Sequence, residues 1–134
     1  LTITTHICRG NHASSWLFSG GYEPIAEELF STNYDGFFLE YDSDRAGDFT
    51  PLRHWSNKES KVVLGLVTSK FPDLEDTEKI KERIKEVQQF VPLENLSISP
   101  QCGFASTEEG NHLTEEEQWK KIQLLQQVAK EVWL

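Results

Sequence analysis

Four side chains of the types that bind soft metal ions occur at separate points of this sequence: His6, Cys8, Glu40 and Cys102. His6 and Cys8 close an apolar, β-branched run at residues 1–5, which predicts a strand. Side chains two apart on a strand share a face and lie about 7 Å apart, so an imidazole and a thiol here could converge on one ion. Glu40 and Cys102 are the candidates for the third and fourth ligands.

Each candidate ligand also has an ordinary structural interpretation. A lone cysteine such as Cys8 or Cys102 is typical of a core position, and His6 could hydrogen-bond within a sheet. Glu40 is different because it interrupts an apolar run, where an ionised carboxylate is costly unless a cation or strong donors compensate it. The spacing alone is not diagnostic of a metal site, so the residues by themselves leave both interpretations open.

The elements that must position these residues follow from the hydrophobic pattern. Apolar runs typical of buried parallel strands occur at 1–5, 37–41, 61–67 and 96–100. Helical periodicity occurs at 24–31, 51–55, 77–91 and 114–132. This alternation predicts an α/β fold of four parallel strands with helices covering the sheet. All four candidate ligands would then lie on the rim where strands end, and Lys70 after the third strand would place a cation beside them.

Two helices carry specific signals. For the third helical segment we expect an N-cap at Asp76 or Thr77 and an apolar stripe of Ile80, Ile84, Val87 and Val91. For the last segment, Thr114 and Glu117 predict a capping box, and the apolar stripe comprises Trp119, Ile122, Leu125, Val128 and Val132. The remaining histidines and three basic residues near the rim are interpreted as solvated surface groups: His12, His54, His112, Arg9, Arg45 and Lys70.

Composition narrows the class of protein. A chain of 134 residues is long enough for a single domain, expected at 1–134, and a formal charge of -9 argues against binding to nucleic acid or anionic membranes. No apolar stretch approaches the roughly 20 residues that span a bilayer, and no signal peptide is recognisable, so we expect a cytoplasmic protein. A disulfide between Cys8 and Cys102 is the alternative to metal binding, and a reducing cytosol favours the metal.

Three sequence blocks, at residues 5–11, 36–41 and 99–103, resemble the C-terminal catalytic barrel of cobalamin-independent methionine synthase and its single-barrel relatives. The blocks contain a His-x-Cys pair, a strand-end Glu and a Pro-x-Cys-Gly sequence, in the order found in that family. The resemblance implies a zinc site formed by His6, Cys8, Glu40 and Cys102. It also implies that homocysteine takes a methyl group from a methyltetrahydrofolate-type donor to give methionine.

The ligand chemistry agrees with that implied reaction. Two thiolates and a carboxylate more than cancel the charge of Zn²⁺, so the ion would be a weak Lewis acid, better suited to a sulfur substrate than to making hydroxide.

Two positions depart from the pattern of the larger synthases. Gln101 stands where they have Asp, and Ser69-Lys70 stands where they have a histidine that serves the proton step. The methyl donor, the thiol and the proton donor therefore stay open.

The family barrel has eight strands and four are predicted here, so we expect the C-terminal half of a (β/α)₈ TIM barrel. Such a half would leave sheet edges exposed, which predicts pairing with the missing half-barrel or self-association. The isolated chain is expected to bind zinc with little or no turnover. Two alternatives remain: zinc-dependent alkyl transfer to another thiol, and a non-catalytic module that zinc stabilises.

Overall fold

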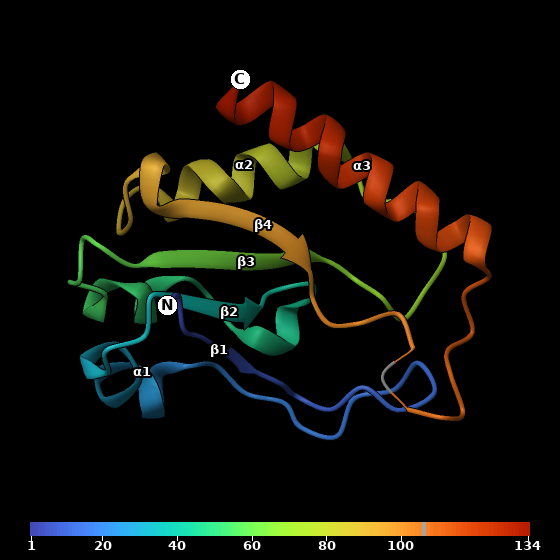
Figure 1. Cartoon of the computed structure of the whole chain (residues 1–134), viewed down its shortest axis with the longest axis horizontal. Coiled ribbons are helices and arrows are strands. Elements are labelled where there is room, and N and C mark those ends of the chain that lie inside the picture. Colours follow the sequence, from blue (N-terminus) through green and yellow to red (C-terminus); the bar gives the residue numbers. More distant parts are fainter. Residues whose placement is uncertain (106) are drawn as a thin grey trace.

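A four-stranded parallel sheet forms the centre of the protein, whose computed structural model describes residues 1–105 and 107–134 (Figure 1). The strand order is β1-β2-β3-β4, so each strand lies beside the next strand of the sequence. The strands are β1 (Thr4–Ile7), β2 (Gly36–Glu40), β3 (Lys61–Val67) and β4 (Leu96–Pro100). The predicted α/β arrangement of four parallel strands is confirmed, although β1 begins later than predicted and leaves Cys8 just past its end.

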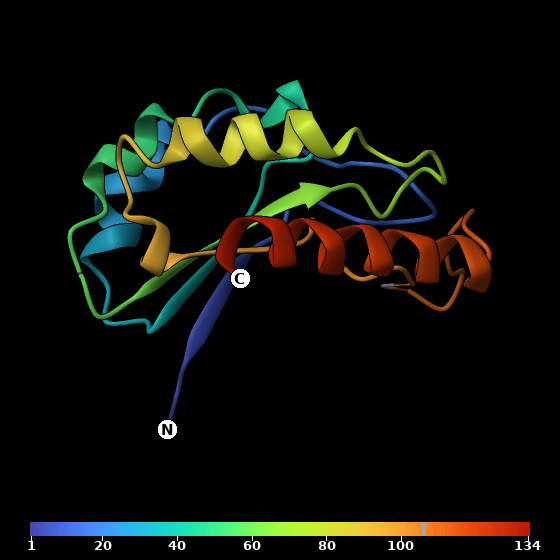
Figure 2. The ribbon, with the colours of Figure 1, turned by 90° about the horizontal axis from the view of Figure 1, so that it is seen from above.

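Helices follow or connect the strands as the periodicity predicted. The α-helices are α1 (Glu23–Ser31), α2 (Thr77–Val87) and α3 (Glu115–Trp133), and the short 3-10 helices are η1 (Asp44–Ala46), η2 (Thr50–His54) and η3 (Leu93–Asn95). The short helix predicted at 51–55 is therefore η2. In Figures 1 and 2, α1 lies on the side of β1 and β2, while α3 packs against β4 and α2.

The helix ends show which local signals were correct. Asp76 caps α2 by accepting a hydrogen bond from the backbone N–H of Glu78, at 2.9 Å. The capping box of α3 is present, with Thr114 and Glu117 exchanging hydrogen bonds. The predicted extension of α2 to Val91 is wrong, because the helix ends at Val87. Val91 is buried beyond the helix and precedes a proline, which disfavours the helical conformation of the residue before it.

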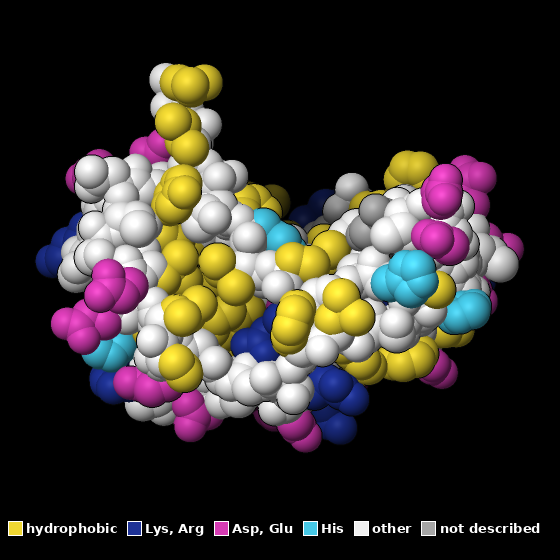
Figure 3. All heavy atoms as spheres, turned by 90° about the horizontal axis from the view of Figure 1, so that it is seen from below, with side chains coloured by type: hydrophobic (Ala, Val, Ile, Leu, Met, Phe, Trp, Pro, Cys, Tyr) yellow, Lys and Arg dark blue, Asp and Glu magenta, His cyan; other side chains and the backbone are white. Residues whose placement is uncertain are grey.

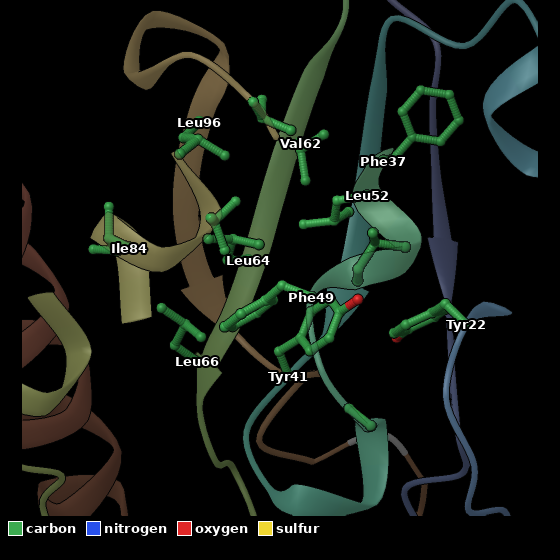
Figure 4. Packing of buried hydrophobic residues seen from close by; sticks show 14 of the residues in the cluster. Tyr22, Phe37, Tyr41, Phe49, Leu52, Val62, Leu64, Leu66, Ile84 and Leu96 are labelled. Atoms are coloured by element: carbon green, nitrogen blue, oxygen red, sulfur yellow. The ribbon is translucent and has the colours of Figure 1, made fainter. Parts of the chain in front are cut away.

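The hydrophobic core lies between one face of the sheet and the helices (Figure 4). Alternate strand residues supply the sheet side, as the two-residue period of a strand requires: Phe37, Leu39, Val62, Leu64, Leu66 and Leu96. The helices add Ala26, Phe30, Ile80, Ile84, Leu124, Leu125 and Val128. Trp119 does not join this core and is 53% exposed, contrary to the predicted stripe of α3. Its indole N–H instead donates to Glu115 one helical turn earlier, at 3.3 Å.

The opposite face of the sheet carries smaller and more polar side chains. His6 pairs with Phe38, Glu40 pairs with Gly65, and Gly65 pairs with Ser99. Paired residues of parallel strands point to the same face, so the strand residues nearest the predicted metal site share this face. None of the helices in the described part of the chain has the length and apolar character that a bilayer crossing requires.

Candidate metal centre

The four predicted ligands come together at the carboxyl ends of β1, β2 and β4. One potential ligand atom from each of His6, Cys8, Glu40 and Cys102 lies within 4.8 Å of the others. A tetrahedral zinc ion with bonds of about 2.0 to 2.3 Å needs ligand atoms roughly 3.3 to 3.8 Å apart. The widest pair therefore has to close by about 1 Å for one ion to bind all four atoms.

Glu40 has the environment of a metal ligand. Its side chain is fully buried at the last residue of β2. Oε1 lies 3.3 Å from the backbone nitrogen of Arg9 and 3.3 Å from Nε2 of His6. Oε2 is also buried, and it has no hydrogen-bond partner among residues 1–105 and 107–134. Because leaving a buried acceptor unpaired costs about 1–3 kcal/mol, and more for a charged group, the free oxygen indicates a position for a cation.

The electrostatics of the cluster also favour a positive charge. Hydrogen bonds of the His6 side chain, first with Cys102 and then with Glu40, raise the pKa of His6 to about 10, against the opposing effect of burial. In the metal-free protein the positive charge is a proton on the imidazole. Zinc requires neutral imidazole and deprotonated thiols, so metal binding would replace protons in the same negative potential. The residues present therefore fit a zinc ion.

A backbone donor lies next to one of the two sulfurs. The N–H of Gly10 donates to Sγ of Cys8 at 3.3 Å. Gly10 has a φ of +91°, and a Cβ at this position would lie 2.6 Å from Cβ of Leu17, so only glycine fits. A hydrogen bond from the surrounding protein to a metal ligand orients that ligand and adjusts how much charge it carries.

A pocket opens beside the cluster. It has a volume of about 430 Å³ and is lined by Thr4, His6, Phe38, Ser99, Pro100, Gln101, Cys102 and Gly103. Two of the four cluster residues thus face a space large enough for an amino-acid-sized ligand. A thiol entering this pocket would approach the sulfur and imidazole ligands directly.

Two of the rim cations are misassigned by the sequence analysis. Arg9 and Lys70 are buried, not solvated, whereas Arg45 is exposed as predicted. The guanidinium of Arg9 lies 4.5 Å from the centre of the Tyr22 ring and donates to the carbonyl oxygens of Gly20 and Arg45. Sequence patterns could not reveal this, because the acceptors lie on other segments of the chain.

The two departures from the family pattern contact each other. The backbone N–H and the hydroxyl of Ser69 both donate to Oε1 of Gln101, each at 2.7 Å. The ammonium of Lys70 donates to three oxygens of the loop after β1. The polar hydrogens of Ser69 and Lys70, the residues at the family's histidine position, are therefore engaged by these acceptors.

The other histidines lie outside the cluster. His12 is exposed, with Nδ1 3.8 Å from Glu109, and His112 is exposed as well. His54 is partly buried, and its Nε2 lies 3.5 Å from Glu23. The metal-ligand candidates therefore remain the four that the sequence suggested.

Known proteins share the sequence and the fold of this chain. The uncharacterised protein YxjH of Bacillus subtilis is 56% identical over 134 residues, covering 99% of this chain and 36% of its own length. A crystal structure from Listeria monocytogenes, assigned provisionally as a vitamin-B12-independent methionine synthase, is 43% identical with a TM-score of 0.77 and covers all of this chain and 36% of its own. A B12-independent methionine synthase from Shewanella sp. W3-18-1, in complex with selenomethionine, shares the fold at 19% identity and a TM-score of 0.74, covering 96% and 38% of the two chains.

This chain therefore spans about a third of the length of the curated relatives it matches. A sequence model of the family described as "Cobalamin-independent synthase, Catalytic domain" matches residues 1–131. This match agrees with the half-barrel topology of the sheet and with the family order of the three sequence blocks. The chain belongs to the family of cobalamin-independent methionine synthase catalytic domains.

Proposed function

We propose that this chain carries the zinc centre of a thiol methyltransferase. In this proposal His6, Cys8, Glu40 and Cys102 hold the ion, homocysteine is the thiol, and a methyltetrahydrofolate-type compound donates the methyl group to give methionine. The observation that carries the proposal is the convergence of the four side chains around a buried carboxylate, one oxygen of which has no partner among the residues that the structure describes.

The groups at the site have separate roles in that reaction. Zinc, when bound, would lower the pKa of the incoming thiol from its usual value of about 8.5 while leaving the sulfur nucleophilic. Glu40 is held in place by the N–H of Arg9, and Cys8 by the N–H of Gly10, so two ligands are fixed before any substrate arrives. Phe38 and Pro100 give the pocket apolar walls, which suit the carbon chain of a thiol substrate.

The pocket supports an amino-acid substrate. The Shewanella protein of the same fold holds selenomethionine, the selenium analogue of the methionine that this reaction would release. Thr4 and Ser99 line the pocket with His6 and Cys102, and their hydroxyl groups are of a type that suits the polar end of an amino acid. We therefore place the thiol in this pocket.

Metal analysis tests the proposal. The purified protein should contain about one zinc ion per chain. Cys102→Ser should lower that content because the thiolate is lost, whereas His12→Ala, which changes an exposed histidine outside the cluster, should not. A metal-free protein that takes up no added zinc, with both thiols free to react, would contradict the proposal.

A second candidate function keeps the metal and changes the substrates. It is zinc-dependent transfer of another alkyl group, or transfer to another thiol. The contact between Ser69 and Gln101 favours it, because both positions differ from the larger synthases and Gln101 lines the pocket. Assays with several thiols and methyl donors separate the two functions. A zinc-dependent gain in stability with no activity for any pair would indicate a non-catalytic module instead.

A further inference from the structure

We propose that Lys70 is a positioning residue for the metal centre, which fixes the backbone beside Cys8 and offsets the negative charge of the ligand set. This inference rests on the proposed function, because it assumes that the four side chains bind a metal ion. It concerns a residue whose type and position in the sequence suggested a surface charge.

The burial of Lys70 is the first observation. Its side chain is fully buried, although lysine is almost never found in such a position unless it is paired. Nζ donates to the carbonyl oxygens of Gly10 and Ser15, at 3.2 and 3.0 Å, and to Oδ1 of Asn11, at 2.9 Å. All three acceptors belong to the loop that follows β1, so one ammonium group from the end of β3 holds this loop.

The contacts lead from Lys70 to a metal ligand. Gly10 accepts from Lys70 through its carbonyl oxygen and donates to Sγ of Cys8 through its N–H. The carbonyl and the N–H belong to the same residue, whose φ of +91° restricts the position to glycine. Moving the loop would therefore displace the hydrogen bond to the sulfur.

Charge is the third observation. The acceptors of Lys70 are neutral, and within the described ranges no carboxylate forms an ion pair with it. Burial lowers the pKa of Lys70, while the charged groups that face it oppose this shift: Glu40, Asp42, Cys102 and Cys8. Three of these four are the anionic ligands of the proposed centre. With zinc bound, the ligand set keeps one net negative charge, which matches the single positive charge of Lys70.

Lys121 provides a matched comparison within the same chain. It is also fully buried, but its ammonium lies 3.0 and 3.1 Å from the two carboxylate oxygens of Glu75. Its charge is thus neutralised directly, and it joins α3 to the loop after β3. Substituting Lys121 should cost stability without acting on the metal centre.

The experiment measures metal binding in the purified protein with Lys70→Met, Lys70→Gln and Lys121→Met. Zinc affinity is measured by competition with a chromophoric chelator, and the thiolate-to-metal charge-transfer band by cobalt substitution. We expect Lys70→Met to weaken zinc binding about 10-fold, the lower end of the effect of removing a group that hydrogen-bonds a metal ligand directly, because Lys70 acts through Gly10. We also expect it to shift the cobalt band. Lys70→Gln, which keeps a donor but no charge, should weaken it less, and Lys121→Met should leave affinity and spectrum unchanged.

Hydrogen exchange of the metal-free protein tests the positioning part independently. Lys70→Met should speed exchange in residues 9–16 relative to wild type, and Lys121→Met should not.

Zinc affinity equal to wild type in folded Lys70→Met, or an equal loss in Lys121→Met, would overturn the inference while the proposed function stands. If Lys70→Met does not fold, unchanged affinity and exchange in Lys70→Gln overturn it. A wild-type protein that binds no zinc overturns the proposed function and the charge-offsetting role, and the exchange result still decides whether Lys70 holds the loop.

Discussion

Glu40 shows at the scale of single residues how a buried charge points to a candidate site. The sequence singled it out because it interrupts an apolar strand, and the structure shows one carboxylate oxygen held by Arg9 and the other unpaired among the described residues. His6, Cys8 and Cys102 were found by residue type and by their order along the chain. The burial of Arg9, Lys70 and Lys121 was not predictable, because it depends on acceptors from distant segments.

Substitution of Glu40 by Gln tests its role as an anionic ligand. The amide keeps the size of the side chain but removes the charge, so we expect zinc affinity to fall by more than the roughly 10–100-fold of an outer-shell change. Chelator competition measures the affinity, and far-UV circular dichroism checks that the fold is kept. Glu109→Gln, at an exposed position near His12, is the control. Equal zinc affinity in Glu40→Gln and wild type would exclude Glu40 as a ligand.

The pKa of His6 predicts how zinc binding depends on pH. In the metal-free protein this pKa is raised to about 10, so at pH 7 to 9 the imidazole holds a proton that zinc must displace. Zinc affinity should therefore rise with pH across this range, since fewer protons compete as the pH approaches the raised pKa. Titrations at pH 7, 8 and 9 measure the slope, with His12→Ala expected to match wild type. Because the thiols of Cys8 and Cys102 also lose protons on binding, a flat profile would show that none of the ligands, His6 included, releases a proton in this range.

Among the secondary-structure elements, β3 and the end of β4 show how the backbone places Cys102. Gly65 of β3 pairs with both Glu40 and Ser99. A Cβ at Gly65 would lie 2.8 Å from Cα of Gln101 and 3.1 Å from the carbonyl oxygen of Leu39. The segment after β4 thus passes against a strand position without a side chain, and this brings Cys102 toward Glu40.

Gly65→Ala should therefore damage both the fold and the site. The added methyl meets backbone atoms on two sides, so we expect a loss of about 1–3 kcal/mol in the free energy of unfolding, together with weaker zinc binding. Urea unfolding and chelator competition measure the two effects. Gly21→Ala is the control, because a Cβ there meets only the carbonyl oxygen of Ala46 at an ordinary 3.5 Å. An unaffected Gly65→Ala variant would show that the close approach is not required.

The elements themselves were largely predictable because each one follows a local rule. Buried strands read as continuous apolar runs, and helices show three-to-four-residue periodicity with a capping box at Thr114. The errors have local causes as well. Pro92 ends the α2 region before Val91 can join the helix, and Trp119 remains exposed near the start of α3 while Lys121 is buried against Glu75. Periodicity counts apolar residues and cannot register a buried ion pair.

For the whole molecule, the feature with most consequence is the open sheet. β1 and β4 are the outer strands of the described sheet, and each has one neighbour only. On the face that carries β1 and α1, hydrophobic side chains gather below the projecting N-terminal residues (Figure 3). Ile3, Leu17 and Phe18 are among the large hydrophobic residues that are exposed. Such edges and patches are usually covered by another part of a protein or by a partner.

We therefore expect residues 1–134, expressed alone, to bind zinc but to show little or no methyl transfer. The pocket beside the cluster is formed from one half of the barrel topology, so the remaining contacts to thiol and methyl donor have to come from elsewhere. Zinc content and turnover measured on the same sample test this, and sedimentation velocity shows whether the chain self-associates. Turnover comparable to that of a complete single-barrel relative would prove the expectation wrong.

The origin of the ligands has a mechanical consequence. Neighbouring strands lie about 4.8 Å apart, so the outermost strands of a flat four-stranded sheet would be separated by roughly 14 Å. His6 belongs to one of these strands and Cys102 follows the other, yet their ligand atoms lie within 4.8 Å. An ion bound by both side chains would hold the carboxyl ends of β1 and β4 at a fixed separation. Removing the ion would let this separation vary, and the curvature of the sheet that a second half-barrel has to fit would vary with it.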